Sequence, residues 1–254
     1  MKDLLLSILL ILFCTSILGQ DDKVLSFDIG YGFNSYKMED LNTYYIDSLA
    51  AKPENDLLRN YVEKGEYFRI GVNYKPVNWV EFGLNANYQF SSLKSSPWEE
   101  YFDSEIGQEV FNKSYYELRT EVIGIGFGAT LFFSECFKSQ ENYIKITRLG
   151  LEMIGGLSFT KVSTIHLVKT FQTFDRTNMY YAKETFQSQI GLKAEYDFTT
   201  TPIITSLGLR AGYQFLKTGV VRDAANQEWN VNDQYPITLD FSGVYFGVYL
   251  KIGK

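Results

Sequence analysis

Hydrophobic and polar residues alternate along positions 66–90, which read EYFRIGVNYK, then PVN, then WVEFGLNANYQF. One parity carries apolar side chains such as Phe68, Val72 and Leu84, and the other carries arginine, lysine, glutamate, asparagine and glycine. A period of two residues predicts β-strands with one apolar and one polar face. Pro76 and Asn78 in the short link between the two runs predict a tight antiparallel hairpin. The apolar face has no charge over about ten residues per strand, which is enough for a tilted strand to cross a bilayer.

The same alternation recurs along the chain and predicts eight strands, at about 25–34, 66–75, 79–90, 115–133, 143–162, 186–198, 206–215 and 243–252. The links between them alternate between long and short. An even number of antiparallel strands places both termini on the side of the short turns, which is periplasmic in outer-membrane barrels. We therefore expect an all-β fold: an eight-stranded antiparallel up-and-down transmembrane β-barrel with four long extracellular loops, at about 37–65, 91–114, 163–183 and 216–237.

Two local features depart from simple alternation. In the fourth strand the polar parity changes between Glu121 and Gly124, and a β-bulge near Val122 would explain this change. In the first long loop, PENDLLRNYVEKG has a proline at its start, spaced apolar residues and a final glycine at position 65. This pattern predicts a short amphipathic helix over 53–65.

The first twenty residues predict a secretory signal peptide. They contain Lys2, an apolar run over 4–13 and small residues before Gln20. We expect the domains to be a signal peptide at 1–20 and an outer-membrane β-barrel at 21–254, with a retained membrane helix as the alternative. Cleavage would remove Cys14 and leave Cys136 as the only cysteine, so no intramolecular disulfide is expected.

The composition agrees with a β-rich membrane protein. Of the 254 residues, 17% are aromatic and 20 are glycine, and only 5 are proline. The mean hydropathy of -0.14 argues against a helical membrane protein but not against a barrel, whose alternating strands average out. The formal charge of -6 argues against binding to nucleic acid, which needs a basic surface.

The pattern resembles the small eight-stranded outer-membrane β-barrels of the OmpX and OmpW kind. Among these it is most similar to the PorT-type barrels of Bacteroidota, in which a glutamine often follows the signal-peptide cut, as Gln20 would here. The resemblance covers nearly the whole mature chain but includes no diagnostic motif. The chain ends in LKIGK rather than in an aromatic residue, which departs from the usual bacterial pattern. The resemblance implies a porin-like, Gram-negative cell-surface protein in the outer membrane.

Charged residues of nearly balanced sign fall on the face predicted to point inward. They are Asp28, Arg69, Lys75, Glu81, Glu117, Arg119, Glu121, Arg148, Glu152, Lys193, Glu195, Asp197, Arg210 and Asp240, with Lys251 at the rim. The interior of an eight-stranded barrel is just wide enough to be filled by its own side chains, and buried charges persist only when they are paired. We expect a closed lumen held by salt bridges; a narrow path for ions or small solutes is the alternative.

His166 is the only histidine, and it raises the possibility of a lipid-modifying enzyme of the outer membrane. Ser163 and Glu152 could complete a catalytic group with it, but a nucleophile needs its base within hydrogen-bond reach and no nucleophile motif surrounds a serine. One histidine and one cysteine in the mature chain give little basis for a metal site. The acidic run 98–109 lacks the ligand spacing of a dedicated calcium loop. We expect no enzyme activity, catalytic residue, metal or cofactor.

The long loops are rich in aromatic residues, which interfaces use as anchors. We expect partner-binding loops that contain Tyr44, Tyr45, Trp98, Tyr101, Phe171, Phe174, Tyr180 and Trp229. The alternative is that these residues pack on one another as a cap above the barrel. The sequence favours a monomeric barrel with a closed lumen that displays its loops to a protein partner or ligand and is surrounded by outer-membrane lipid. A soluble lipocalin-like carrier, with its apolar face inside, is a third possibility.

Overall fold

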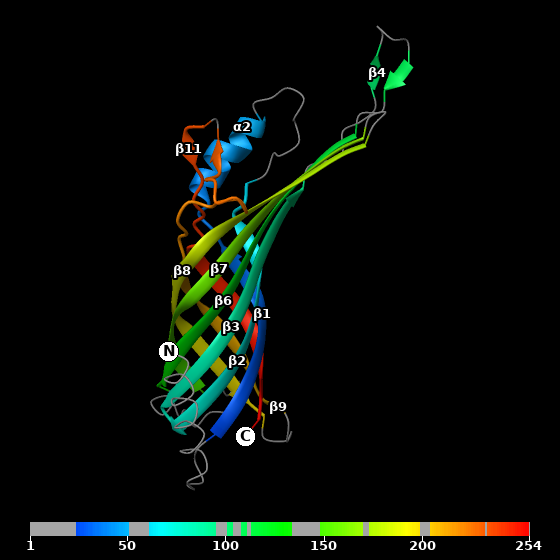
Figure 1. The fold of residues 1–254 in the computed structure, drawn as a ribbon. Helices are drawn as coiled ribbons and strands as arrows, with labels where there is room; N and C mark the ends of the chain where they lie inside the picture. Colours follow the sequence, from blue (N-terminus) through cyan, green and yellow to red (C-terminus); the bar gives the residue numbers. More distant parts are fainter. Residues whose placement is uncertain are drawn as a thin grey trace.

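The computed structural model describes residues 24–50, 61–94, 101–103, 108–110, 113–133, 148–169, 173–198, 204–231 and 233–253. Eight antiparallel strands form a closed barrel in the order β1-β12-β9-β8-β7-β6-β3-β2 (Figure 1). Their bounds are Val24–Ser35 (β1), Lys64–Val77 (β2), Val80–Lys94 (β3), Lys113–Phe132 (β6), Arg148–Lys169 (β7), Thr173–Asp197 (β8), Ile204–Phe215 (β9) and Gly243–Ile252 (β12). The predicted fold class is therefore confirmed.

The predicted outward face of the barrel is confirmed as an apolar belt. Its exposed side chains include Phe27, Ile29, Ile70, Leu84, Ile125, Phe127, Leu157, Leu192, Leu209 and Val248. The residues between them, such as Asp28, Asn85 and Lys193, are buried inside the ring. A closed ring leaves no unpaired sheet edge within the belt, which is what a β-structure needs in lipid. A closed barrel with this belt places the chain in the outer membrane.

Pairs of glycines allow neighbouring strands to approach closely inside this narrow barrel. Gly32 lies opposite Gly247 on β12, and Gly126 lies opposite Gly156 on β7. A Cβ atom added at Gly32 would collide with the backbone carbonyl oxygen of Phe246, and one at Gly156 with that of Ile125. Backbone cannot move aside as a flexible side chain can, so side chains at these positions would force the strands apart.

Strands β6, β7 and β8 continue well beyond the barrel as a narrow curved sheet, which we call the arm (Figure 1). The arm comprises the parts of these strands at 113–121, 161–169 and 173–183. The loop predicted at 163–183 is therefore wrong over most of its length, because β7 and β8 pair with each other up to Lys169 and Thr173. The C-terminal end of β12 lies at the opposite end of the barrel (Figure 1).

The bulge predicted near Val122 is absent from the described pairings of β6, which keep an unbroken register with both β3 and β7. A register shift instead occurs where β8 passes Ser158–Thr160 of β7: the two residues Lys183 and Glu184 of β8 lie opposite the single residue Phe159, so β8 carries one extra residue. Polarity changes along β6 because its surroundings change. The residues that follow Glu121 lie in the lipid-facing barrel, and those that precede it lie in the arm, whose outer face meets water.

Shorter elements lie outside the barrel, at the end from which the arm extends (Figure 1). The first loop contains a π-helical segment, η1 (Leu41–Ile46), followed by α2 (Asp47–Ala50). Part of the helix predicted at 53–65 lies outside the described residues; the described part is not helical, and Gly65 lies inside β2. Two small hairpins are β4 (Tyr101–Asp103) with β5 (Gln108–Val110), and β10 (Asn230–Val231) with β11 (Tyr235–Pro236). In the part of the chain described, no helix is long and apolar enough to span a membrane.

Candidate functional site

The barrel interior at the short-turn end is an ion cluster. Lys193 Nζ lies 2.5 Å from Glu81 Oε1, and Lys251 Nζ lies 2.5 Å from the other oxygen of the same carboxylate. Lys251 also donates to Glu195 at 2.8 Å, and Tyr249 donates its hydroxyl to Glu195 at 2.9 Å. All five side chains are buried. Each ammonium thus has two carboxylates, which is the condition for keeping charges inside a protein.

A second ion cluster lies at mid-height. Arg69 forms two hydrogen bonds with Glu152, at 3.2 and 3.0 Å, and this bidentate geometry fixes both side chains. Arg210 lies between carboxylates, 2.6 Å from Asp28 and 3.6 Å from Glu152. Asn73 donates to Asp28 at 2.8 Å. The two clusters together hold four buried carboxylates and four buried cations, so their formal charges cancel.

Amide side chains and tyrosines fill the barrel toward the arm. Gln89 and Gln214 exchange hydrogen bonds at 2.9 and 3.1 Å, and Asn34 and Gln189 join them at 2.9 and 2.8 Å. Gln214 also donates to the backbone carbonyl oxygen of Phe241 at 3.2 Å, which links this layer to the cap above it. The described lumen therefore passes from ions to amides and then to an apolar cap.

Most of the charges predicted to point inward do so, with exceptions at the ends. Arg148 and Asp197 pair at 2.9 Å near the short-turn rim, where both are partly exposed. Glu117, Arg119 and Glu121 are wrongly assigned: they lie on the outer face of the arm, where Arg119 pairs with Glu117 at 2.8 Å and Glu121 faces Lys161 at 3.6 Å. Asp240 belongs to the cap, where its backbone oxygen accepts from the amides of Lys37 and Met38.

The cap is a second hydrophobic core, built by the first and last loops against the inner face of the arm. Its buried members are Tyr36, Met38, Leu41, Ile46, Val62, Leu118, Val122, Val162, Leu216, Val221, Trp229, Val231, Ile237, Leu239 and Phe241. Leu118 of β6 and Val162 of β7 belong to the arm, and Val122 of β6 lies just below it, so the arm supplies one wall of this core. The cap therefore fixes the base of the arm to the two loops.

Three of the aromatic residues predicted to bind a partner pack together in this cap. Trp229 is sandwiched: Tyr180 stacks on it at 4.3 Å between ring centroids, and Tyr45 meets it edge-on at 4.8 Å. Tyr44 stacks on Tyr235 at 4.6 Å. Burial raises the pKa of the Tyr45 hydroxyl to about 12.

The remaining predicted anchors give less information. Trp98 and Phe171 lie outside the described residues, and for Tyr101 and Phe174 only the backbone in β4 and β8 is described. A role of any of these eight residues in binding stays a prediction.

His166 does not meet the residues that the sequence offers as its catalytic partners. Ser163 is three residues away on β7, about 10 Å along an extended strand, and Glu152 is fourteen residues away, about 46 Å. Glu152 is also occupied by Arg69 inside the barrel. The structure therefore does not bring these three residues together as a nucleophile, base and acid would require.

His166 lies instead in a row across the inner face of the arm, which we call the Tyr–His–Arg row. The strand register places Tyr116 of β6 and Arg176 of β8 directly on either side of it. The Tyr116 and His166 rings stack at 3.9 Å with 12° between their planes. Partial burial and the nearby Arg176 guanidinium lower the pKa of His166. The sequence does not reveal this row, because a segment interpreted as a loop has no cross-strand neighbours to assign.

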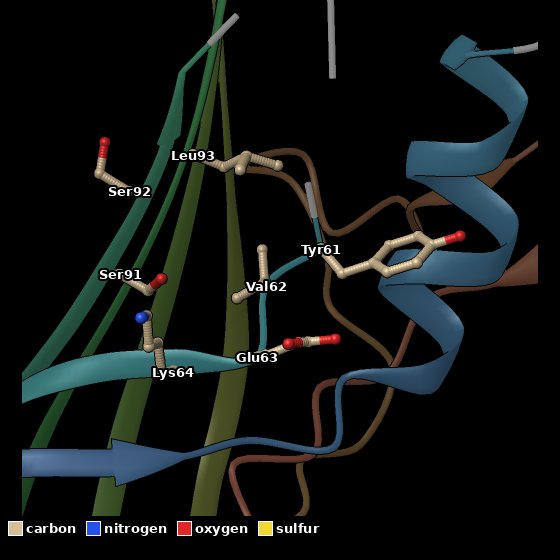
Figure 2. A pocket seen from close by; sticks show the side chains of 7 residues that line it. All are labelled: Tyr61, Val62, Glu63, Lys64, Ser91, Ser92 and Leu93. Atoms are coloured by element: carbon tan, nitrogen blue, oxygen red, sulfur yellow. The ribbon is translucent and has the colours of Figure 1, made fainter. Parts of the chain in front are cut away.

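A cleft of about 530 Å³ opens at the base of the arm, where β2 and β3 separate (Figure 2). β2 pairs with β3 only as far as Glu66 and Phe90, while β3 continues along β6 to Lys94. The cleft is lined by Tyr61, Val62, Glu63, Lys64, Ser91, Ser92 and Leu93. It contains one carboxylate and one ammonium group, so its lining has no net charge. Among the described residues, no group of three or more His, Cys, Asp or Glu side chains could hold a metal ion.

No protein-family model matches this sequence, and no curated protein sequence matches it. Similar solved structures include Ail, the attachment invasion locus protein of Yersinia pestis, at 13% identity and a TM-score of 0.30, covering 91% of this chain and 97% of that one. A major outer membrane protein from Thermus thermophilus has 9% identity and a TM-score of 0.40, with coverages of 89% and 99%. Neisserial surface protein A has 14% identity and a TM-score of 0.32, with coverages of 91% and 96%.

Proposed function

We propose that this chain is a non-conducting outer-membrane barrel whose arm and cap, displayed outside the cell, bind a partner. The observation that carries the proposal is the arm itself. β7 and β8 extend as a paired sheet to Lys169 and Thr173, far beyond the length needed to connect two membrane strands. Long ordered extensions of compact folds are usually functional.

The outer edge of the arm supports a binding role. Along Thr173–Gln187, β8 has no strand partner among the described residues other than β7, apart from one bridge in which Tyr181 and Arg222 exchange backbone hydrogen bonds. Proteins usually protect such an edge with charged side chains, especially lysine, with proline or with a bulge. The stretch TFDRTNMYYA at 173–182 has no proline, lysine or bulge before the irregularity at Lys183, and its charged residues are confined to Asp175 and Arg176. Apart from those of Tyr181, its outward backbone groups have no strand partner among the described residues, which is the arrangement that strand addition uses.

The interior supports the absence of conduction. Both ion clusters are buried, their charges cancel, and each side chain holds its partners across the lumen. An eight-stranded barrel has little room left once such side chains fill it. We expect the purified protein to give no steady single-channel current in planar lipid bilayers. A stable, reproducible current from the wild type would contradict the closed lumen and favour transport.

Partner binding is tested by photo-crosslinking on intact cells. A photoreactive amino acid at Met179, exposed on the arm, should give a discrete crosslinked product, and one at Leu250, in the lipid-facing belt, should not. In a shortened variant, residues 165–177 are replaced by a tight turn that joins Thr164 to its pairing partner Asn178. This variant, with the photoreactive residue still at Met179, should fold and should not give the crosslinked product. Surface-displayed protein that gives no product at Met179 would contradict the proposal.

A further inference from the structure

We propose that the Tyr–His–Arg row, Tyr116, His166 and Arg176, binds a phosphate or sulfate group carried by a molecule outside the cell. The inference deepens the proposed function and rests on it, because it assigns a ligand chemistry to the inner face of the arm. Its basis is the arrangement of three donor side chains on one face of the arm.

The strand register fixes the spacing of the row. His166 pairs with Tyr116 on one side and with Arg176 on the other, and neighbouring strands lie about 4.8 Å apart. The three side chains share the face of the arm that holds Leu118, Val162 and Tyr180 further down, so they point to the same side. Arg176 is exposed and Tyr116 and His166 are partly exposed, so a ligand can reach all three.

Arg176 is prepared to bind an oxyanion. Its Nε donates to the Asn178 side chain at 3.4 Å, which orients the guanidinium, and no carboxylate of the described residues forms a salt bridge with it. The neighbouring Asp175 pairs with Leu167 and lies on the opposite face of the strand. A guanidinium presents its terminal N–H groups as a fork that matches two oxygens of a phosphate or sulfate group.

His166 and Tyr116 complete the site. The Tyr116 ring, stacked on the imidazole at 3.9 Å, holds the orientation of the imidazole ring. Two cationic groups side by side repel each other, and this repulsion contributes to the lowered pKa of His166. A doubly charged anion between His166 and Arg176 would replace this repulsion with attraction on both sides.

The groups facing His166 favour an anion rather than a cation. Among the described side chains, its nearest titratable or charged neighbours on this face are Tyr116 from β6, Arg176 from β8 and Tyr45 from the cap. Tyr180 lies further down the same face, and the carboxylate near it is Asp223 of the last loop. Tyr45 stays neutral because burial raises its pKa. The row therefore differs in charge from the cleft of Figure 2, in which the opposite charges of Glu63 and Lys64 cancel.

The test uses the single histidine of the chain, whose ring signal in an NMR spectrum needs no assignment. The pKa of His166 is measured in detergent micelles against increasing inorganic phosphate, at an ionic strength held constant with chloride. Anion binding and imidazole protonation are reciprocally coupled, so phosphate should raise this pKa by a saturable amount. Sulfate keeps its charge between about pH 5 and 8, where His titrates, so its affinity should increase as the pH falls through the pKa of His166.

Two matched variants separate this site from general charge effects. Arg176→Gln, at an exposed position that should not affect folding, should abolish the saturable pKa shift. Arg222→Gln, which removes an arginine paired with Glu228 on the cap, should leave it unchanged. Absence of a phosphate or sulfate effect in the wild type, or an equal effect in Arg176→Gln, would overturn the inference. If phosphate or sulfate binds but no crosslink forms at Met179, the result would support the anion site and contradict only the proposed binding of a partner.

Discussion

The barrel and arm portions of β6, β7 and β8 have opposite polarity. In the barrel, the outer face is apolar and the inner face is polar or small; examples are Ile125, Leu157 and Leu192 outside, and Gly126, Glu152 and Lys193 inside. In the lower arm, where it packs on the cap, the outer face is polar and the inner face is apolar; examples are Arg119, Lys161 and Thr177 outside, and Leu118, Val162 and Tyr180 inside. The polarity of the two faces is thus reversed along the same continuous strands where they leave the membrane.

This inversion shows that alternation of polar and apolar residues predicts a β-strand but does not predict whether its outer face meets lipid or water. Inside the barrel the outer face meets lipid and the inner face meets a closed network of ions and amides. In the arm the outer face meets water and the inner face meets the cap. A side chain is selected by what lies beyond its face, so a strand that crosses from lipid to water must reverse its pattern.

Removing one member of the buried ion clusters should have the largest effect. Glu152→Gln leaves Arg69 and Arg210 without this carboxylate, and breaking a buried pair typically costs about 3–5 kcal/mol. Denaturant unfolding in lipid vesicles measures the loss. The matched arm variant Glu121→Gln, which disrupts a partly exposed pair with Lys161, should cost below about 1 kcal/mol. Equal costs would show that the barrel interior is as open to water as the arm.

The second largest difference in stability between barrel and arm should come from a charge placed on the outer face. Leu192→Arg puts a cation into the lipid-facing belt and should destabilise the folded barrel by about 2–4 kcal/mol. Thr177→Arg lies on the outer face of the arm on the same strand and should change stability by less than about 0.5 kcal/mol. The same unfolding assay compares them. A tolerated Leu192→Arg would mean that this face does not meet lipid.

The smallest expected effect is confined to the cap. Val162→Ala removes two buried methyl groups from the inner face of the arm, which at about 0.8 kcal/mol per buried carbon costs about 1–2 kcal/mol. Hydrogen exchange of cap amides should accelerate while that of the barrel strands stays unchanged. Lys161→Ala, on the adjacent outward residue, is the control and should alter neither. Faster exchange throughout the barrel would show that cap and barrel unfold together.

The barrel could be predicted because each of its strands repeats one simple pattern. The assigned faces of Phe27 and Asp28, or of Leu192 and Lys193, follow from parity alone. The arm could not be predicted in this way, because a reversed pattern in TKVSTIHLV reads as the end of a strand when the outer face is assumed to meet lipid. For the same reason the parity change in β6 suggests a bulge on that strand, although the irregularity lies on β8.

The candidate sites depend on contacts between distant parts of the sequence. Tyr45, Tyr180 and Trp229 come from the first loop, the arm and the last loop, and no local pattern indicates that their rings meet. The neighbours of His166 follow only once β6, β7 and β8 are known to pair in the arm. The side chains that would be charged in the lumen could be identified from parity, but their pairing, such as Arg69 with Glu152, could not.

The most direct test of the polarity inversion is a spin-label scan along β8, with Cys14 and Cys136 replaced by serine and one labelled cysteine introduced at a time. Oxygen, which concentrates in lipid, should reach labels at Phe186, Ile190 and Leu192, whereas a water-soluble nickel reagent should reach those at Thr177, Met179 and Tyr181. The outward positions should be odd-numbered in the arm, before Lys183, and even-numbered in the barrel, after Glu184, because the register shifts between them. A single unbroken parity along the strand, or oxygen-dominated relaxation at Thr177 and Met179, would contradict the account.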